Sequence, residues 1–166
     1  KRQVSAFGGI VAFNCEINET IASEIIKTFY EVILSPKVED QARKILSSKK
    51  NLRVLEYEAP ENTSSLSATF MQKTFLLQDE NYSFTKKEDL KIVTKHKPNE
   101  TEIKNLLFAN QVCKHVKSNA IVIAKNNKTL GVGAGQTSRV GATEIACKNA
   151  KRFFNEEIIG SSAASD

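Results

Sequence analysis

The segment whose residue types and spacing best suit ligand binding is Gly131–Val140. It reads Gly-Val-Gly-Ala-Gly-Gln-Thr-Ser-Arg-Val. Its glycines alternate directly before the predicted start of a helix, where free N–H groups and the helix dipole favour an anion or an amide-rich ligand. Gln136, Ser138 and Arg139 add polar side chains. No Gly-Lys-Ser/Thr follows, and the glycine spacing differs from the dinucleotide fingerprint. Taken alone, the pattern is equally typical of a tight turn between a strand and a helix.

Composition excludes several classes of protein. The charge of +5 is mild, its lysines are scattered, and there is no aromatic signature of an RNA binder. A solvated surface explains this charge, although a modest positive field would also suit small anionic substrates. No apolar run approaches the ~20 residues that span a bilayer, and the first residues lack the apolar region of a signal peptide. We expect a cytoplasmic protein that binds neither nucleic acid nor membrane.

The three cysteines, Cys15, Cys113 and Cys147, are odd in number and have no metal-ligand spacing. We therefore predict buried, reduced thiols and no cysteine-based metal site.

The first 57 residues predict an alternation of short strands and helices. A glycine-containing loop leads into a short buried strand within residues 4–14, and Asn18 or Thr20 caps a helix with an apolar face. The remaining predicted elements are a strand at Glu31–Leu34, a helix at residues 39–47 and a strand at Asn51–Tyr57. Residues 58–68 are polar and rich in turn formers, so we place a lobe boundary there.

The second half begins with weakly alternating residues, in which we predict the strands Phe70–Gln78 and Leu90–Val93. After Pro98, Asn99 or Thr101 caps a helix with acidic residues at its positive end. The elements predicted next are a strand at Asn119–Ala124, a hairpin turn at Lys125–Lys128, a strand at Thr129–Gly133, and a helix after Ser138 whose apolar residues are Val140, Ile145, Ala146, Ala150 and Phe153. This order predicts a layered α/β domain.

Several of these segments also carry a family resemblance. The segments are residues 106–109, 114–121 and 131–140 in the second half and residues 4–12, 31–36 and 49–55 in the first, with Thr94-Lys95 and Pro98 between them. In order and spacing they resemble the AICAR transformylase (formyltransferase) domain of the bifunctional purine-biosynthesis enzymes, AICAR formyltransferase/IMP cyclohydrolase. AICAR is 5-aminoimidazole-4-carboxamide ribonucleotide. Residues 160–166 are similar to the start of a phenylalanine-rich family motif.

The resemblance implies an α/β fold of duplicated cytidine-deaminase-like, three-layer α/β/α lobes without zinc, only partly covered by this chain. Residues 1–60 would be the end of the first lobe and residues 61–166 most of the second. The sequence lacks the His-x-Glu and Pro-Cys-x-x-Cys ligands of zinc deaminases, in agreement with that expectation.

The activity implied for the parent protein is transfer of a formyl group from 10-formyltetrahydrofolate to the 5-amino group of AICAR, in IMP biosynthesis. The family acts as a homodimer with shared active sites. Ser118 and Asp166 stand where the family can hold a structural potassium ion. Chemistry of this kind must orient a poorly nucleophilic amine, remove a proton and stabilise charge on the formyl oxygen.

Five positions match family contacts. Gly8 and Glu31 match contacts to the nucleotide, Arg139 matches another, and Val140 matches a folate contact. Asn119 matches the catalytic position near the amine and the formyl group. Two alternatives stay open at this point, because Glu31 could be a solvated carboxylate at a strand end and Asn119 could simply close a turn.

One family feature is missing. The proton-transfer histidine of the family belongs to a Lys-His pair that would lie upstream of Lys1, while His96 and His115 match a connector and a helix surface. We expect the chain alone to be catalytically incompetent, with a non-catalytic nucleotide- or folate-binding module as the alternative function. The companion cyclohydrolase domain is not expected in this chain.

Overall fold

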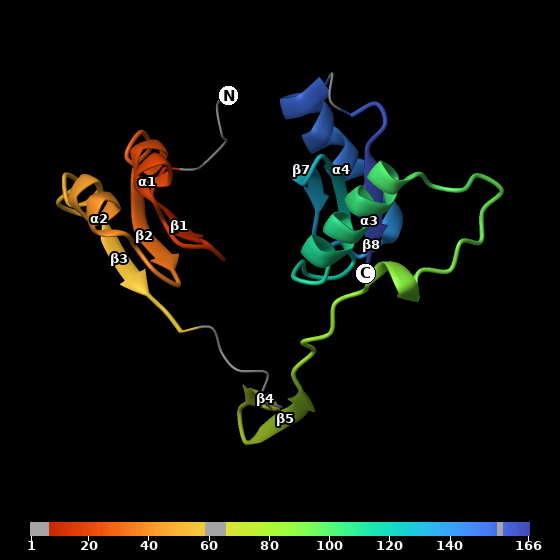
Figure 1. The fold of residues 1–166 in the computed structure, drawn as a ribbon. Coiled ribbons are helices and arrows are strands. Elements are labelled where there is room, and N and C mark those ends of the chain that lie inside the picture. The colour runs from red at the N-terminus through yellow and green to blue at the C-terminus, as the bar shows by residue number, and fades with distance from the viewer. Residues whose placement is uncertain (1–6, 59–65, 156–157) are drawn as a thin grey trace. The chain divides into compact units, whose positions relative to one another are not determined.

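A computed structural model describes residues 7–58, 66–155 and 158–166 of the chain. These residues form two compact units, 1–80 and 81–166, which are described separately (Figure 1). The division falls at residue 80, whereas the sequence placed a boundary at residue 60 within a segment that lies mostly outside the described residues. The assignment of the two parts to family lobes stays a prediction. Within the described ranges, no helix has the length and apolarity needed to cross a bilayer.

The first unit contains a three-stranded parallel sheet in the order β1-β2-β3. Its elements are β1 (Gly9–Ala12), α1 (Glu19–Ile25), β2 (Tyr30–Ser35), α2 (Asp40–Leu46) and β3 (Arg53–Glu56). Each new strand is added on the same side of the previous one. Because the crossover connections are right-handed, both helices lie on the same face of the sheet. Figure 1 shows α1 and α2 side by side on that face. The strands and helices predicted for residues 9–56 are therefore confirmed.

The core of the first unit lies between this sheet and its helices. Ile33 of β2 is fully buried against Ala22 and Ala42 of the two helices. The residues that point to the other face are open, since Ile10 is 70% and Leu55 52% exposed. The prediction of a buried strand within residues 4–14 was therefore wrong about burial. β1 is an edge strand, and among the described residues α1 and α2 cover only one side of it.

A two-stranded antiparallel hairpin follows, formed by β4 (Leu66–Met71) and β5 (Thr74–Asp79). The predicted single strand Phe70–Gln78 was wrong, because the chain reverses at Gln72, whose φ is +49°. The predicted strand Leu90–Val93 was also wrong. A short 3₁₀ helix, Lys87–Asp89, precedes it, and a strand needs a neighbouring strand to accept its hydrogen bonds, which no described segment provides there.

The second unit is a three-layer α/β/α arrangement around an antiparallel sheet in the order β7-β6-β8. Its elements are α3 (Glu100–Cys113), β6 (Ile121–Lys125), β7 (Lys128–Gly133), α4 (Arg139–Phe154) and β8 (Ser162–Ser165). Val122 and Ala124 of β6 pack toward α3, whereas Ile123 packs with the alanines of α4. Alternate residues of one strand thus serve opposite helices, and the predicted layered α/β domain is confirmed.

Local signals set the ends of these elements. Asn99 caps α3 and forms a capping box with Glu102, and Ser138 caps α4 through the Gly141 N–H. Asn126 and Asn127 both have positive φ, which the tight turn between β6 and β7 requires. The cap of α3 and the turn follow the sequence prediction, which placed a helix after Ser138 without naming its cap.

The apolar face of α4 differs from the prediction. Val140 is 69% and Phe153 39% exposed, and the buried residues are Ala142, Ala146 and Ala150. The cause lies in β7, because a Cβ on Gly133 would come within 1.9 Å of the Ala142 carbonyl oxygen. The helix lies so close to the sheet that only small residues fit between them.

Candidate functional site

The alternating glycines do not act as one loop. Gly131 and Gly133 lie inside β7, where a Cβ on Gly131 would come within 2.1 Å of the Ala146 carbonyl oxygen. Only Gly135 lies in the turn itself, with φ +63° and its N–H donating to the Lys117 carbonyl at 2.6 Å. Gly131 and Gly133 therefore serve the close packing of α4, and their spacing of two residues places both on the face of β7 that meets this helix.

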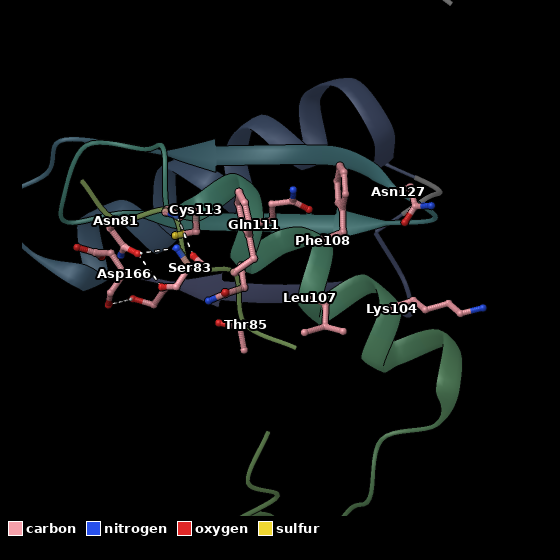
Figure 2. A pocket seen from close by; sticks show the side chains of 14 residues that line it. Asn81, Ser83, Thr85, Lys104, Leu107, Phe108, Gln111, Cys113, Asn127 and Asp166 are labelled. Carbon is pink, nitrogen blue, oxygen red and sulfur yellow. Dashed lines mark hydrogen bonds between the residues drawn. The ribbon is translucent and has the colours of Figure 1, made fainter. Parts of the chain in front are cut away.

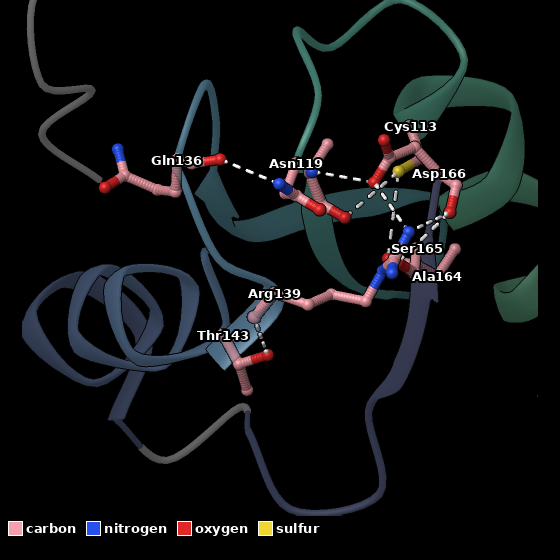
Figure 3. A network of polar contacts seen from close by, with 9 residues as sticks. Cys113, Asn119, Gln136, Arg139, Thr143, Ala164, Ser165 and Asp166 are labelled. Atoms are coloured by element: carbon pink, nitrogen blue, oxygen red, sulfur yellow. Dashed lines mark hydrogen bonds and ion pairs between the residues drawn. The ribbon is translucent and has the colours of Figure 1, made fainter. Parts of the chain in front are cut away.

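Asn119 is tied to that turn. Its backbone N–H donates to the Gln136 carbonyl at 3.1 Å, and its side-chain Nδ2 donates to the same oxygen at 2.9 Å (Figure 3). A carbonyl oxygen only accepts, so the amide nitrogen must face Gln136. Asn119 does close a turn, as the alternative held, but the same contact directs its Oδ1 acceptor away from Gln136.

Arg139 is the first residue of α4, and its side chain is held by the end of β8. Its Nε donates to the Ser165 hydroxyl at 2.9 Å, and its Nη2 donates to the Asp166 carbonyl at 3.2 Å. The Asp166 carboxylate lies 4.0 Å from Nη2, and the arginine side chain is 59% exposed (Figure 3). Val140 follows on the first turn of the helix, and its side chain is exposed.

Asp166 joins the Asn119 turn to Arg139. Its Oδ1 accepts the Ala120 N–H at 2.8 Å, directly after Asn119. The hydrogen bond from the Ser118 hydroxyl, followed by the one from Ala120, holds the pKa of the Asp166 carboxyl below its usual value. Sequence reasoning named Asp166 only through the potassium resemblance and missed Ser165 entirely. Its contact arises from the pairing of β8 with β6, which no local sequence signal encodes.

The two residues that the resemblance links to potassium are in contact with each other. The Ser118 hydroxyl and the Ala120 N–H both donate to the Asp166 carboxylate, so part of its acceptor capacity is used. The described residues contain no cluster of three or more His, Cys, Asp or Glu side chains suited to a metal. Potassium binding stays a prediction.

Gly8 and Glu31 form a second group, within the first unit. Gly8 has φ +73°, a left-handed conformation that favours glycine, and its N–H donates to the Phe29 carbonyl at 2.9 Å. A Cβ on Gly8 would lie 3.5 Å from Oε1 of Glu31. The structure therefore brings Gly8 beside Glu31, and Asn119 beside the anchor of Arg139. Assembly of the two groups into one site stays a prediction.

Neither histidine lies in these groups. The His96 side chain is 77% exposed, with Nε2 3.4 Å from Oε2 of Glu102. His115 is exposed in the turn after α3. Their positions agree with the interpretation of His96 as connector and of His115 as helix surface.

The thiols divide by environment. Cys113 is buried as predicted, and its burial raises the pKa of its thiol. Cys147 is half-buried, and Cys15 is exposed, so the prediction of burial was wrong for Cys15. Cys15 lies in the loop between β1 and α1, outside the layer between sheet and helices.

The second unit also has a pocket of about 850 Å³ beside α3 (Figure 2). Phe108 and Gln111 of α3 line it, together with the segment from Asn81 to Thr85 and the end of β8. The pocket lining shares Cys113, Ser165 and Asp166 with the polar network of Figure 3, so the pocket adjoins the anchor of Arg139 without including Arg139 or Asn119.

Comparisons with known proteins identify the family of the chain. Residues 2–149 match the family model described as AICARFT/IMPCHase bienzyme. A bifunctional purine biosynthesis protein PurH of Cereibacter sphaeroides is 45% identical over 151 residues, which are 90% of this chain and 28% of that protein. The PurH of Acetivibrio thermocellus is 43% identical over 166 residues, which are 98% of this chain and 32% of that protein. The PurH of Trichodesmium erythraeum is 44% identical over 163 residues, covering 98% and 31%. The chain thus spans about a third of the length of these relatives.

Proposed function

Because the chain belongs to the AICARFT/IMPCHase bienzyme family, we propose that it forms part of the formyltransferase half of a purine-biosynthesis enzyme. In the parent protein this half would transfer a formyl group from 10-formyltetrahydrofolate to the 5-amino group of AICAR. The observation that carries the proposal is the family match over residues 2–149, which includes every proposed site residue.

The polar network of the second unit supports specific roles within this reaction. Asn119 Oδ1, directed away from Gln136, can accept a hydrogen bond from the amine and so orient the nucleophile. Arg139 offers its guanidinium to an anionic group of the nucleotide. The exposed side chain and backbone of Val140 give the folate an apolar surface.

The first unit would contribute to the nucleotide. The left-handed backbone at Gly8 lets a ligand approach closely, and the neighbouring Glu31 carboxylate can accept from a hydroxyl or an amide. Neither histidine lies at either group in the described residues, so the family's proton-transfer histidine has no counterpart there. We expect this chain alone to bind ligand without turnover.

Further parts of the proposal come from the resemblance. The two units would belong to duplicated cytidine-deaminase-like lobes, and the three-layer second unit suits such a lobe. The parent enzyme would be a homodimer whose copies share active sites, and a structural potassium ion would bind near Ser118 and Asp166.

Calorimetry with AICAR and with a folate analogue tests the proposal on this chain. Arg139→Ala should weaken AICAR binding by about tenfold or more, because a charge-assisted contact is lost. Arg152→Ala is the matched control, since Arg152 lies on the same helix and contacts the Phe153 ring. Equal AICAR affinity in wild type and Arg139→Ala would contradict the assigned role.

A folate-dependent formylation assay on the same chain separates binding from catalysis. We expect AICAR binding with no formylated product. Measurable turnover would contradict the expectation of inactivity and return His96 and His115 to consideration as the base. Absence of binding to both ligands would contradict the function itself as well as the alternative of a binding module.

A further inference from the structure

We propose that Ser165 is a positioning residue, which holds one edge of the Arg139 guanidinium so that the opposite part faces an oxyanion of the ligand. The inference rests on the proposed function for the role of Arg139. It adds a residue outside the five site positions, and its basis is the contact between α4 and β8.

The geometry of a guanidinium fixes what remains for a ligand. Nε and Nη2 share one edge of the planar group, and both donate to the end of β8, to Ser165 Oγ at 2.9 Å and to the Asp166 carbonyl at 3.2 Å. Arginine has five N–H donors in a rigid fork. One N–H of Nη1 and the second N–H of Nη2 therefore form the fork that is left for an anion, and its direction is set by the strand.

The strand itself is fixed at this point. Ser165 pairs with Ile121 in the ladder between β8 and β6, and Asp166 accepts the Ala120 N–H at 2.8 Å. Ser165 is therefore anchored to the same chain segment that carries Asn119. One anchor sets the position of Arg139 relative to the residue proposed to orient the amine.

The charge of Arg139 stays available despite these contacts. The nearest carboxylate oxygen, Asp166 Oδ1, lies 4.0 Å from Nη2, and the arginine side chain is 59% exposed. Long exposed arginine side chains lose rotamer freedom when they bind. Anchoring by Ser165 removes part of that loss beforehand, which is the general benefit of preorganisation.

The oxyanion can come from two sources, the phosphate of the nucleotide or a carboxylate of the folate. Both fit a planar fork of N–H donors. Ligand pairs with and without each group separate the sources: AICAR with its nucleoside, and folic acid with pteroic acid, which lacks the glutamate.

The test measures these four ligands by calorimetry on wild type, Ser165→Ala, Ser165→Thr and Ser162→Ala. Ser165→Ala should weaken binding of the ligand that carries the recognised oxyanion by about tenfold and leave its partner within about twofold. Ser165→Thr keeps the hydroxyl and should restore affinity. Ser162→Ala makes the same change at the other end of β8 and should match wild type.

Exchange of the Arg139 Nε–H, followed by NMR, reports on the contact without any ligand. We expect slow exchange in wild type, Ser165→Thr and Ser162→Ala, and fast exchange in Ser165→Ala. A fall in affinity that is equal for both members of a pair would assign Ser165 a general structural role and overturn the proposal. Unchanged affinity in Ser165→Ala would overturn it too.

Failure of the proposed function looks different. If wild type binds none of the four ligands, both the function and the ligand-directed role of Ser165 are contradicted. If wild type binds AICAR and Arg139→Ala weakens it, while Ser165→Ala does not, the function stands and only the positioning role fails.

Discussion

The two three-stranded sheets of this chain are covered differently. In the parallel sheet of the first unit, the helices pack on one face, and Ile10 and Leu55 on the other face are 70% and 52% exposed. In the antiparallel sheet of the second unit, α3 and α4 pack on opposite faces, and alternate residues of β6 are buried on both sides. Parallel sheets are normally covered on both faces, so the first unit has a face that can accept further packing.

The difference extends to how closely helix and sheet approach. The first unit uses large side chains such as Ile33 and Leu46 between its layers. The face toward α4 uses glycines in β7 and alanines in the helix, which bring the backbones together. This close approach places the start of α4, with Arg139, at a fixed distance from the sheet edge that holds Ser165. Small residues here position polar groups as much as they fill a core.

The largest effect should come from Gly133→Ala. The new methyl group would lie 1.9 Å from the Ala142 carbonyl oxygen, so α4 must move away from the sheet. We expect a loss of about 3–5 kcal/mol in the free energy of unfolding, the range of severe overpacking. Urea denaturation, together with amide hydrogen exchange of β6, would measure it.

Gly141→Ala is the control for that substitution. A Cβ there would meet only the Ser138 hydroxyl at 3.2 Å, and alanine is the better helix former. Its stability should stay within about 1 kcal/mol of wild type. Comparable losses in both variants would show that the close approach of α4 and β7 is not what Gly133 provides.

The second prediction compares the two faces of the first sheet. Ile33→Ala removes a fully buried side chain and should cost about 3 kcal/mol, by lost burial and a new cavity. Ile10→Ala changes a side chain that is 70% exposed and should stay within about 0.5 kcal/mol. Denaturant unfolding of both variants checks the pair, and a large loss in Ile10→Ala would mean that this face is covered in solution.

Local chemistry explains which parts of the fold the sequence could predict. The cap of α3 at Asn99, the turn at Asn126-Asn127 and the start of a helix after Ser138 depend on a few neighbouring residues, and all three were predicted. The hairpin of β4 and β5 was missed because its turn places a positive φ on Gln72, without the glycine or asparagine that normally marks such a position.

Tertiary contacts explain what the sequence could not predict. From the sequence, the glycines of β7 were equally consistent with a ligand-binding loop and with a turn. The role of Gly133 in close packing depends on the position of α4, which the sequence does not show. Ser165 was missed for the same reason, because its contact with Arg139 joins residues that are 26 positions apart. The family resemblance could be found from the sequence, because the order of motifs along the chain does not depend on these contacts.

The third prediction compares helix starts in the two units. Asn99 caps α3 with its side chain, whereas Glu39 at the start of α2 makes no such hydrogen bond. Asn99→Ala should therefore lower the free energy of unfolding by about 1 kcal/mol. Glu39→Asn should raise the free energy of unfolding of the first unit by at least a few tenths of about 1 kcal/mol. Thermal unfolding followed by circular dichroism would measure both. A loss in Glu39→Asn would show that α2 is capped in a way its backbone geometry does not reveal.

The smallest effects should be those of pH, and they act at opposite ends of the scale in the two units. The pKa of Asp166 is lowered by the Ser118 and Ala120 hydrogen bonds, so its stabilisation of the second unit is present above the unfolded value of about 3.9 and lost as pH falls through the folded pKa. The Glu16 carboxylate raises the pKa of Lys37, so its contribution to the first unit is present below about pH 10.4 and lost at higher pH.

Asp166→Asn and Lys37→Met separate these two dependences. The stability difference between wild type and Asp166→Asn should shrink between pH 5 and about pH 2, and of the two only the difference for Lys37→Met should shrink above about pH 10. Added salt should weaken the Lys37 effect more, because its ion pair with Glu16 at 2.8 Å involves a lysine side chain that is 71% exposed. Urea unfolding across pH would detect both trends. A constant difference for Asp166→Asn down to pH 2 would mean that the hydrogen bonds, and not the carboxylate charge, supply what Asp166 contributes to the anchor of Arg139.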